Sequence, residues 1–260
     1  VSPQALTCLR WAVACAALAV FARRPLLAEW HRIVPSWRRV LAMGACGYTI
    51  YASLFYAAGT LTRGVNLALL QGAIPVLVIL LNFAVYRRVV TWGQGVGVAV
   101  AASHGDWRVL ATLDFNRGDL LMLAACVLYA GYTVALPSRP KVSSLTFFTA
   151  MAAAALATSL PLLLAEWAAG QTIWPTPKGW LIVAFVGLGP SLAAQLFFMR
   201  GVELIGPNRA GVFVNLVPVF GAALAVLLVG EPFGWNDALA LALVLGGILV
   251  AERLGRRPAP

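Results

Sequence analysis

Residues 65–86 read VNLALLQGAIPVLVILLNFAVY, an unbroken run without a charged side chain. A helix that crosses the hydrocarbon core of a bilayer needs about 20 predominantly apolar residues. Similar runs fill the rest of the chain, which has 260 residues, 61% of them hydrophobic and 11% charged. Soluble domains carry roughly 25% charged residues, so this composition excludes a water-soluble globule. We therefore expect an all-α polytopic membrane protein.

Charged residues, prolines and tryptophans divide the apolar sequence into nine expected transmembrane helices. We place them near residues 3–22, 39–60, 65–86, 92–104, 119–137, 143–166, 179–199, 209–229 and 235–254. The fourth is short, because the segment from Trp92 to Ser103 would cover only ~18 Å of a ~30 Å core. We expect residues to be missing there, with a half-helix as the alternative.

The basic residues indicate how the helices are oriented. The formal net charge is +10, and the loops after the first, third, fifth, seventh and ninth helices hold most of the 19 Lys and Arg residues. The opposite loops hold Arg63, Arg108, Arg117 and Lys178. Because cytoplasmic loops are rich in Lys and Arg, this bias explains the charge without a nucleic-acid partner. It predicts a cytoplasmic C-terminus, an external Val1 and one further N-terminal helix, so that the whole protein has ten.

Several functional classes lack the residues that they require. Cys8, Cys15, Cys46 and Cys126 lie in apolar stretches without Cys-x-x-Cys spacing, so we expect no disulfide, no metal site and no cofactor. An intramembrane enzyme would need clustered His, Asp or Glu, or a Ser-His or Ser-Lys pair, within the spans. A channel subunit would be expected to show rings of charge or repeated filter carbonyls. The sequence shows none of these patterns, and a membrane scaffold or channel subunit remains a weaker alternative.

An internal repeat appears when the sequence is compared with itself. Pro75 pairs with Pro218, and Trp92 pairs with Trp235 at the same offset. This offset spans five helices, an odd number, so the two copies must face opposite ways across the membrane. Inverted repeats are typical of transporters, whose substrate site lies near mid-membrane at the repeat interface. We expect a first repeat at 1–105, an external loop at 106–118 and a second repeat at 119–260.

Four groups of residues carry a resemblance to a known family. They are Ser2-Pro3 followed by Leu9-Arg10, the segment around Pro75, the run from Asn208-Arg209-Ala210 through Leu216-Val217-Pro218 to Gly230-Glu231-Pro232, and Gly246-Gly247-Ile248. In these the chain resembles the EamA-type transporters of the drug/metabolite transporter superfamily, above all bacterial amino-acid and metabolite exporters, including the aromatic amino-acid exporter type. The resemblance implies ten helices in two inverted five-helix repeats with cytoplasmic termini. Arg87-Arg88 departs from the family, which has Gly-Glu there.

Arg10 is the one charged residue away from the ends of the expected spans. It is interpreted as a structural or gating cation, with carboxylate binding as the alternative. No Asp or Glu falls in the middle of a span. Proton-coupled carriers usually use a buried carboxylate or His. The sequence therefore favours uncoupled export of amino acids or related metabolites from a bacterial inner membrane, and a proton-coupled drug or metabolite antiporter is the alternative.

Polar and aromatic residues mark the expected wall of the substrate cavity. Phenol hydroxyls and amides need hydrogen-bond partners, so a cavity suits them better than lipid does; helix packing is the alternative. The candidate residues are Tyr48, Tyr51, Phe55, Gln71, Asn82, Tyr129, Tyr132, Ser191, Gln195 and Asn215, with Pro75 and Pro218 at mid-helix as structural or gating positions. The expected partners are a small-molecule substrate and membrane lipid, and the expected assembly is a monomer or weak homodimer.

Overall fold

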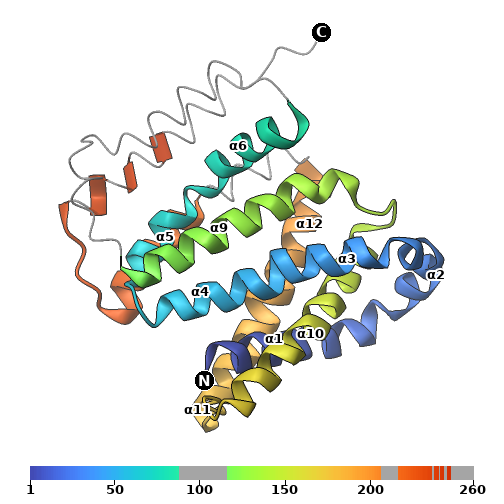
Figure 1. Cartoon of the computed structure of the whole chain (residues 1–260), viewed down its shortest axis with the longest axis horizontal. Coiled ribbons are helices and arrows are strands. Elements are labelled where there is room, and N and C mark those ends of the chain that lie inside the picture. Colours follow the sequence, from blue (N-terminus) through green and yellow to red (C-terminus); the bar gives the residue numbers. More distant parts are fainter. Residues whose placement is uncertain (88–115, 206–215, 236, 240, 243–244, 247–260) are drawn as a thin grey trace. The chain divides into compact units, whose positions relative to one another are not determined.

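The computed structural model describes residues 1–87, 116–205, 216–235, 237–239, 241–242 and 245–246 (Figure 1). In these ranges every regular element is a helix. Six helices there are long and apolar enough to cross a membrane, namely Pro3–Phe21, Arg23–Gly59, Gly64–Tyr86, Arg117–Ser138, Ser144–Ala168 and Pro177–Gly201. A shorter apolar helix covers Val217–Val229. The expected all-helical fold is confirmed for the described residues, and their six long apolar helices are consistent with a polytopic membrane protein.

The six long helices coincide with six of the nine expected spans. The expected span 92–104 lies outside the described residues, as do 209–215 and most of 235–254. The chain forms two compact units, each of which contains parts of both expected repeats: Val1–Ser53 with Ala135–Ala210, and Leu54–Val134 with Gly211–Pro260. The first is called unit 1 and the second unit 2. The assignment of the repeats stays a prediction.

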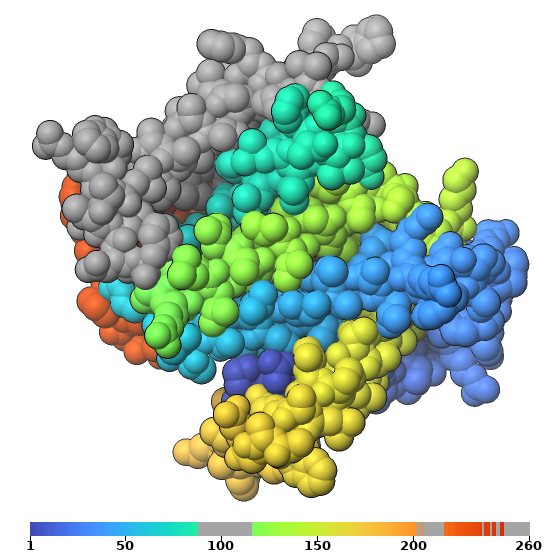
Figure 2. Space-filling view, in the orientation of Figure 1, coloured from blue at the N-terminus to red at the C-terminus, as the bar shows by residue number. Residues whose placement is uncertain are grey.

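Unit 1 is built from helices of its two chain segments. Its elements are α1 (Pro3–Phe21), α2 (Arg23–Ile33), η1 (Val34–Ser36), α3 (Trp37–Gly44), η2 (Ala45–Ile50), the start of α4 (Tyr51–Gly59), η3 (Leu136–Ser138), α10 (Ser144–Ala168), α11 (Pro177–Leu188), η4 (Gly189–Ala193) and α12 (Ala194–Ile205). α10 packs against α1 and α3, and its yellow surface meets the blue surface of α3 in Figure 2.

Polar residues fix the helix ends of unit 1. Pro3 opens α1, where its missing N–H is not needed. The Glu166 carboxylate, near the end of α10, accepts hydrogen bonds from the Ser2 hydroxyl (2.6 Å) and the Gln4 N–H (3.3 Å). A carboxylate at this position is stabilised by the free N–H groups and dipole of a helix N-terminus. Glu166 therefore ties the start of α1 to the end of α10.

The core of unit 1 combines small residues with a few large ones. Ala14 and Ala22 lie in one buried cluster with Ala152 and Ala155 of α10. Gly187 of α11 lies so close to α1 that an added Cβ would be 2.8 Å from Val13 Cβ. Small residues allow membrane helices to approach this closely, which increases van der Waals contact. The close approach of α1 to α10 and α11 positions the residues described below.

Unit 2 contains the rest of α4, followed by α5 (Gly64–Gln71), α6 (Ile74–Tyr86), α9 (Arg117–Ala135), α14 (Val217–Leu224) and η5 (Ala225–Val229). α14 packs against α5, where a Cβ on Gly221 would lie 2.9 Å from Ala68 Cβ. A second buried cluster joins Ala58, Leu67, Met122 and Cys126.

Two expectations about helix limits were wrong. The expected loop between residues 22 and 39 is helical, as α2 and η1. Glu203, expected in a loop, lies in α12, which continues beyond the apolar span that ends at Gly201. Both segments contain charged residues, and apolar runs mark only the part of a helix that lies in hydrocarbon.

The expected helix 65–86 is interrupted next to Pro75. α5 ends at Gln71 and α6 begins at Ile74, and the N–H groups of Gly72 and Ala73 bond to carbonyls three residues back. Pro75 has no N–H, and its ring clashes with the carbonyl four residues earlier, that of Gln71. Pro75 therefore lies within the long helix Gly64–Tyr86, at a local break where α6 begins. Pro218 is likewise the second residue of α14, and the residues before Leu216 lie outside the described ranges.

Candidate functional site: an arginine between two π-helical segments

Two π-helical segments of unit 1 occupy related positions in the sequence. η2 interrupts the helix formed by α3 and α4, and η4 interrupts the helix formed by α11 and α12. Tyr48 lies in η2 and Ser191 lies in η4, and the offset between them equals the offset between Pro75 and Pro218. Short π-helical turns inside α-helices are often found at functional sites.

Arg10 of α1 connects the two π-helical segments. Its Nη1 donates to Ser191 Oγ (3.0 Å), and its Nη2 donates to the backbone oxygen of Tyr48 (3.4 Å). Ser191 is 2% exposed, so this polar contact is shielded from solvent. Because a guanidinium holds several donors in a fixed plane, it can bind both segments at once. The interpretation of Arg10 as a structural or gating cation agrees with these contacts.

Three aromatic side chains surround this connection. The rings of Trp11 and Tyr48 stack, with centroids 4.9 Å apart and planes 8° apart. Phe148 of α10 meets Tyr48 edge-on at 6.4 Å. The Arg10 guanidinium carbon lies 4.6 Å from the Trp11 ring centroid, a distance that allows a cation–π interaction. We call Arg10, Trp11, Tyr48, Phe148 and Ser191 the Arg10 cluster.

The Trp11 indole N–H is an unsatisfied donor of the Arg10 cluster. Trp11 is 2% exposed, and its Nε1 has no acceptor among the residues that the structure describes. Buried indole N–H groups usually find a partner, since leaving one unpaired costs about 1–3 kcal/mol. A buried donor beside a stacked aromatic pair is suited to contact an acceptor on a bound molecule.

Two further candidates lie close in sequence to the Arg10 cluster. Tyr51 is the first residue of α4, and Gln195 is a half-buried residue of α12, one turn after Ser191. Tyr48, Tyr51 and Phe55 stand at i, i+3 and i+7, a spacing that would place them on one face of a regular α-helix. η2 lies within this stretch and widens the turn, so that register changes at Tyr48.

The remaining described candidates belong to unit 2. The rings of Tyr129 and Tyr132, on α9, are 5.6 Å apart, and those of Phe55 and Tyr56 are 5.7 Å apart. Gln71 ends α5, and Asn82 lies on α6; both are half-buried. Asn215 lies outside the described residues.

Carboxylates of the described helices serve at helix ends instead of at metal sites. Asp119, in the first turn of α9, accepts a hydrogen bond of 2.7 Å from the Thr62 hydroxyl. No group of three His, Cys, Asp or Glu residues within the described ranges could hold a metal ion.

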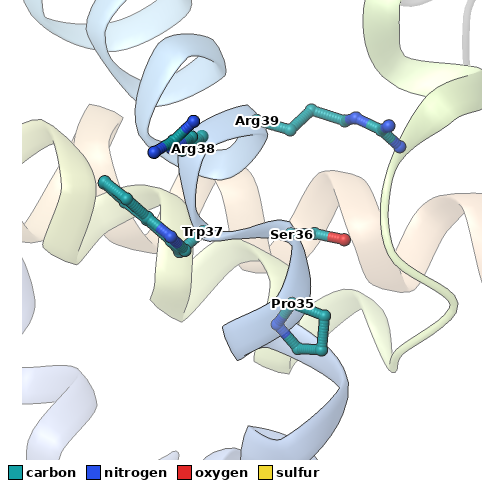
Figure 3. A pocket seen from close by; sticks show the side chains of 5 residues that line it. All are labelled: Pro35, Ser36, Trp37, Arg38 and Arg39. Carbon is teal, nitrogen blue, oxygen red and sulfur yellow. The ribbon is translucent and has the colours of Figure 1, made fainter.

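A hollow of about 500 Å³ lies at the surface of unit 1, and none of the residues that line it belongs to the Arg10 cluster. Pro35, Ser36, Trp37, Arg38 and Arg39 line it, at the turn from α2 to α3 (Figure 3). Arg38 lies over the Trp37 ring, whereas Arg39 extends the other way and donates to the Ser138 backbone oxygen (2.7 Å). Its open, basic lining is unlike that of the Arg10 cluster.

Comparison with known proteins shows which family has this fold. The EamA-like transporter family model matches residues 1–103 and 116–252. The chain belongs to the EamA-like transporter family. Its members are transporters and not enzymes.

Individual EamA relatives are similar over different lengths. The uncharacterized transporter YyaM of Bacillus subtilis is 26% identical over 234 residues, which cover 84% of this chain and 74% of YyaM. YwfM, an uncharacterized transporter of the same species, is 27% identical over 89% of this chain and 80% of its own length. The aromatic amino acid exporter YddG of Ancylobacter novellus is 28% identical over 55% of this chain and 49% of its own length.

A solved crystal structure matches 96% of this chain and 87% of its own chain, with a TM-score of 0.62 and 23% identity. At this identity the likeness concerns the fold alone.

Gly230 and Glu231, which belong to the residues that resemble the EamA family, end one helix and bind the start of another. Gly230 follows the last helical turn with φ +75°, a conformation that glycine adopts without steric cost. Glu231 then accepts hydrogen bonds from the N–H groups of Gly64 (2.7 Å) and Val65 (3.0 Å), at the start of α5. Arg87, which stands one repeat offset before Gly230, has φ +52°. The same backbone conformation therefore recurs at the repeat offset with a different side chain.

Sequence reasoning missed Trp11 and Phe148. Both are aromatic residues within apolar spans, where such side chains are equally suited to lipid or to helix packing. The one signal in the sequence was the position of Trp11 next to Arg10, the single charged residue away from the ends of the expected spans.

Proposed function

We propose that this EamA transporter is a secondary carrier that exports small organic solutes, amino acids or related metabolites, across a bacterial inner membrane. The family and the name of the relative YddG support this class of substrate. In the proposed orientation the C-terminus is cytoplasmic, as the distribution of Lys and Arg favours.

The observation that carries the proposal is the contact of Arg10 with both π-helical segments. Alternating access requires helices that move against one another around a central site. Arg10 binds Tyr48 and Ser191, which stand one repeat offset apart, so the same side chain holds both segments in this conformation. We assign Arg10 a gating role, in which these two contacts are made in one state and exchanged in another.

The stacked rings of Trp11 and Tyr48 support a solute with both apolar and polar parts, as does the Trp11 N–H, which has no acceptor among the described residues. A ring or aliphatic side chain would pack on the aromatic groups, and an oxygen of the solute would accept from the indole N–H. Tyr51 and Gln195, which also belong to unit 1, are proposed to contribute other parts of the cavity wall. The candidates of unit 2 stay predictions.

Counterflow in proteoliposomes tests the proposed carrier. Internal unlabelled L-phenylalanine should stimulate uptake of external labelled L-phenylalanine, because a carrier returns faster when loaded. Trp11→Phe keeps a ring for stacking and removes the donor. We expect this variant to raise the half-saturating concentration about tenfold, the loss of roughly 1.4 kcal/mol in one buried hydrogen bond.

Trp30→Phe is the matched control, because Trp30 is half exposed on α2. It should leave counterflow unchanged. Uptake without counterflow would favour a channel, and no uptake of any tested amino acid would contradict the proposed substrate class. Equal behaviour of Trp11→Phe and the wild type would remove Trp11 from the binding site while leaving the carrier function intact.

A further inference from the structure

The helix α2 has the composition of a segment at the membrane surface. It follows directly on α1, and Figure 1 shows it in blue at the end of the first span. Leu27 (62% exposed), Trp30 (51%) and Val34 (44%) are spaced at i, i+3 and i+7, so they form one exposed apolar stripe. Basic residues accompany the stripe, namely Arg23, Arg24, Arg32, Arg38 and Arg39. Apolar faces of this kind, with Trp and Arg, are typical of helices that lie in the headgroup region.

A groove of about 250 Å³ lies beside α2, where α1, α2 and α10 come together in unit 1. Cys15 and Leu18 of α1, Leu26 of α2 and Ala153 of α10 line it with apolar or small side chains. The hydroxyl of Thr149, another lining residue, is already bound to the Leu145 backbone oxygen at 2.8 Å. The wall therefore offers almost no polar group to a ligand.

Arg23 is the one charged residue among those that line this groove. It is exposed at the start of α2, and no acidic residue shares the lining. The described residues include a single side-chain ion pair, Arg63 with Asp237, so Arg23 has no carboxylate partner there. A guanidinium at one end of an apolar groove is complementary to a molecule with a long apolar body and an anionic head.

We propose that the groove between α1, α2 and α10 binds an anionic phospholipid. One acyl chain lies against Leu18, Leu26 and Ala153, and the phosphodiester accepts hydrogen bonds from Arg23. The membrane supplies this ligand at the level where α1 ends and the stripe of Leu27, Trp30 and Val34 meets the headgroups. Arginine is well suited to this contact because its planar donors match two phosphate oxygens. Leu18 also belongs to the buried cluster that contains Trp11 and Phe148, but none of the residues that line the groove is a member of the Arg10 cluster. The lipid proposal does not depend on the proposed solute.

Lipid binding by the purified full chain tests this site. Native mass spectrometry in a neutral detergent would give apparent Kd values for dioleoyl phosphatidylglycerol and for dioleoyl phosphatidylcholine, which have the same acyl chains. We expect tighter binding of phosphatidylglycerol. Arg23→Gln should weaken this binding about tenfold, as expected when one charge-assisted hydrogen-bond partner is lost. Ala153→Phe, which fills the groove, should weaken the binding of the same lipid to a similar degree.

The matched controls are Arg24→Gln, which removes the adjacent exposed charge, and Ala16→Phe, which places the same ring at an exposed position of α1 outside the groove lining. Each should change the Kd by less than about twofold, since an exposed charge or ring away from the ligand contributes little. Size-exclusion profiles and thermal midpoints would verify that the variants fold. If Ala153→Phe does not fold, the comparison of Arg23→Gln with Arg24→Gln decides alone.

Three results would overturn the proposal. Equal binding of phosphatidylglycerol and phosphatidylcholine would show that the headgroup charge does not contribute to binding. Equal losses in Arg23→Gln and Arg24→Gln would indicate a diffuse basic surface without a groove site. Full displacement of phosphatidylglycerol by millimolar inorganic phosphate would show that the headgroup alone is recognised and that the acyl chain does not occupy the groove.

Discussion

Arg87 is the residue whose backbone conformation fits its side chain least. It has φ +52° and ψ +24° and is the one non-glycine residue with positive φ in the described part of the chain. Gly230, one repeat offset later, has φ +75° and ψ +25°. The left-handed conformation costs an L-residue roughly 1–2 kcal/mol, whereas glycine adopts it freely.

Arg87→Gly should therefore stabilise the protein. We expect the free energy of unfolding to rise by about 1 kcal/mol, because the greater entropy of glycine in the unfolded chain offsets part of the relieved strain. Thermal unfolding in detergent would measure the change. Arg87→Ala is the control, since it removes the same charge but keeps a Cβ. A gain of the same size in Arg87→Ala would trace the effect to the charge and not to the backbone.

At the scale of the helices, close approach depends on a few positions without side chains. A Cβ on Gly187 of α11 would lie 2.8 Å from Val13 Cβ and 3.1 Å from the Arg10 backbone oxygen. These distances are too short for a Cβ contact, so α11 would have to move away from α1. That movement would also displace η4, which carries Ser191 and follows α11 directly.

We predict that Gly187→Ala lowers the free energy of unfolding by about 1–3 kcal/mol, the usual effect of overpacking a well-packed interface. Gly131→Ala is the matched control, because a Cβ there would have nothing within 4 Å. On α9 the control substitution should be neutral, or stabilising by up to about 1 kcal/mol through helix propensity. Equal thermal midpoints for the two variants would contradict the close approach of α11 to α1.

The helices also show what could be predicted from the sequence. The six long spans were predicted because hydrocarbon demands a continuous apolar run, and charge or proline marks its ends. α2 was missed because its helix lies in a charged segment, and the gap between α5 and α6 was missed because Pro75 was placed at the middle of one helix. η2 and η4 leave no mark in hydropathy, since they differ from α-helix only in the spacing of backbone hydrogen bonds. Arg10 and Ser191 were both candidates in the sequence. Their direct contact was not predicted, because it depends on η4, which the sequence did not reveal.

For the molecule as a whole, the placement of acidic groups bears on energy coupling. Among the described helices the acidic residues stand near helix ends or beyond the apolar spans. Glu166 and Glu231 accept backbone N–H groups at the starts of α1 and α5. Asp119 is engaged with Thr62 in the first turn of α9. These carboxylates accept hydrogen bonds at the ends of helices, away from the middle of the apolar spans. A group that carries a proton through the membrane must instead exchange it during each cycle.

Transport is therefore predicted to be independent of a proton gradient. Arg10, a charged residue in the interior of α1, does not release its proton in proteins, so it cannot serve as the exchanging site. Uptake of zwitterionic L-phenylalanine into proteoliposomes should reach the same final level with and without an imposed pH gradient, and the level should equal equilibrium with the medium. A pH-sensitive dye trapped inside the vesicles would verify that the gradient persists during the measurement. Accumulation above equilibrium only in its presence would establish the proton-coupled antiporter instead, and the proton site would then have to lie outside the described helices.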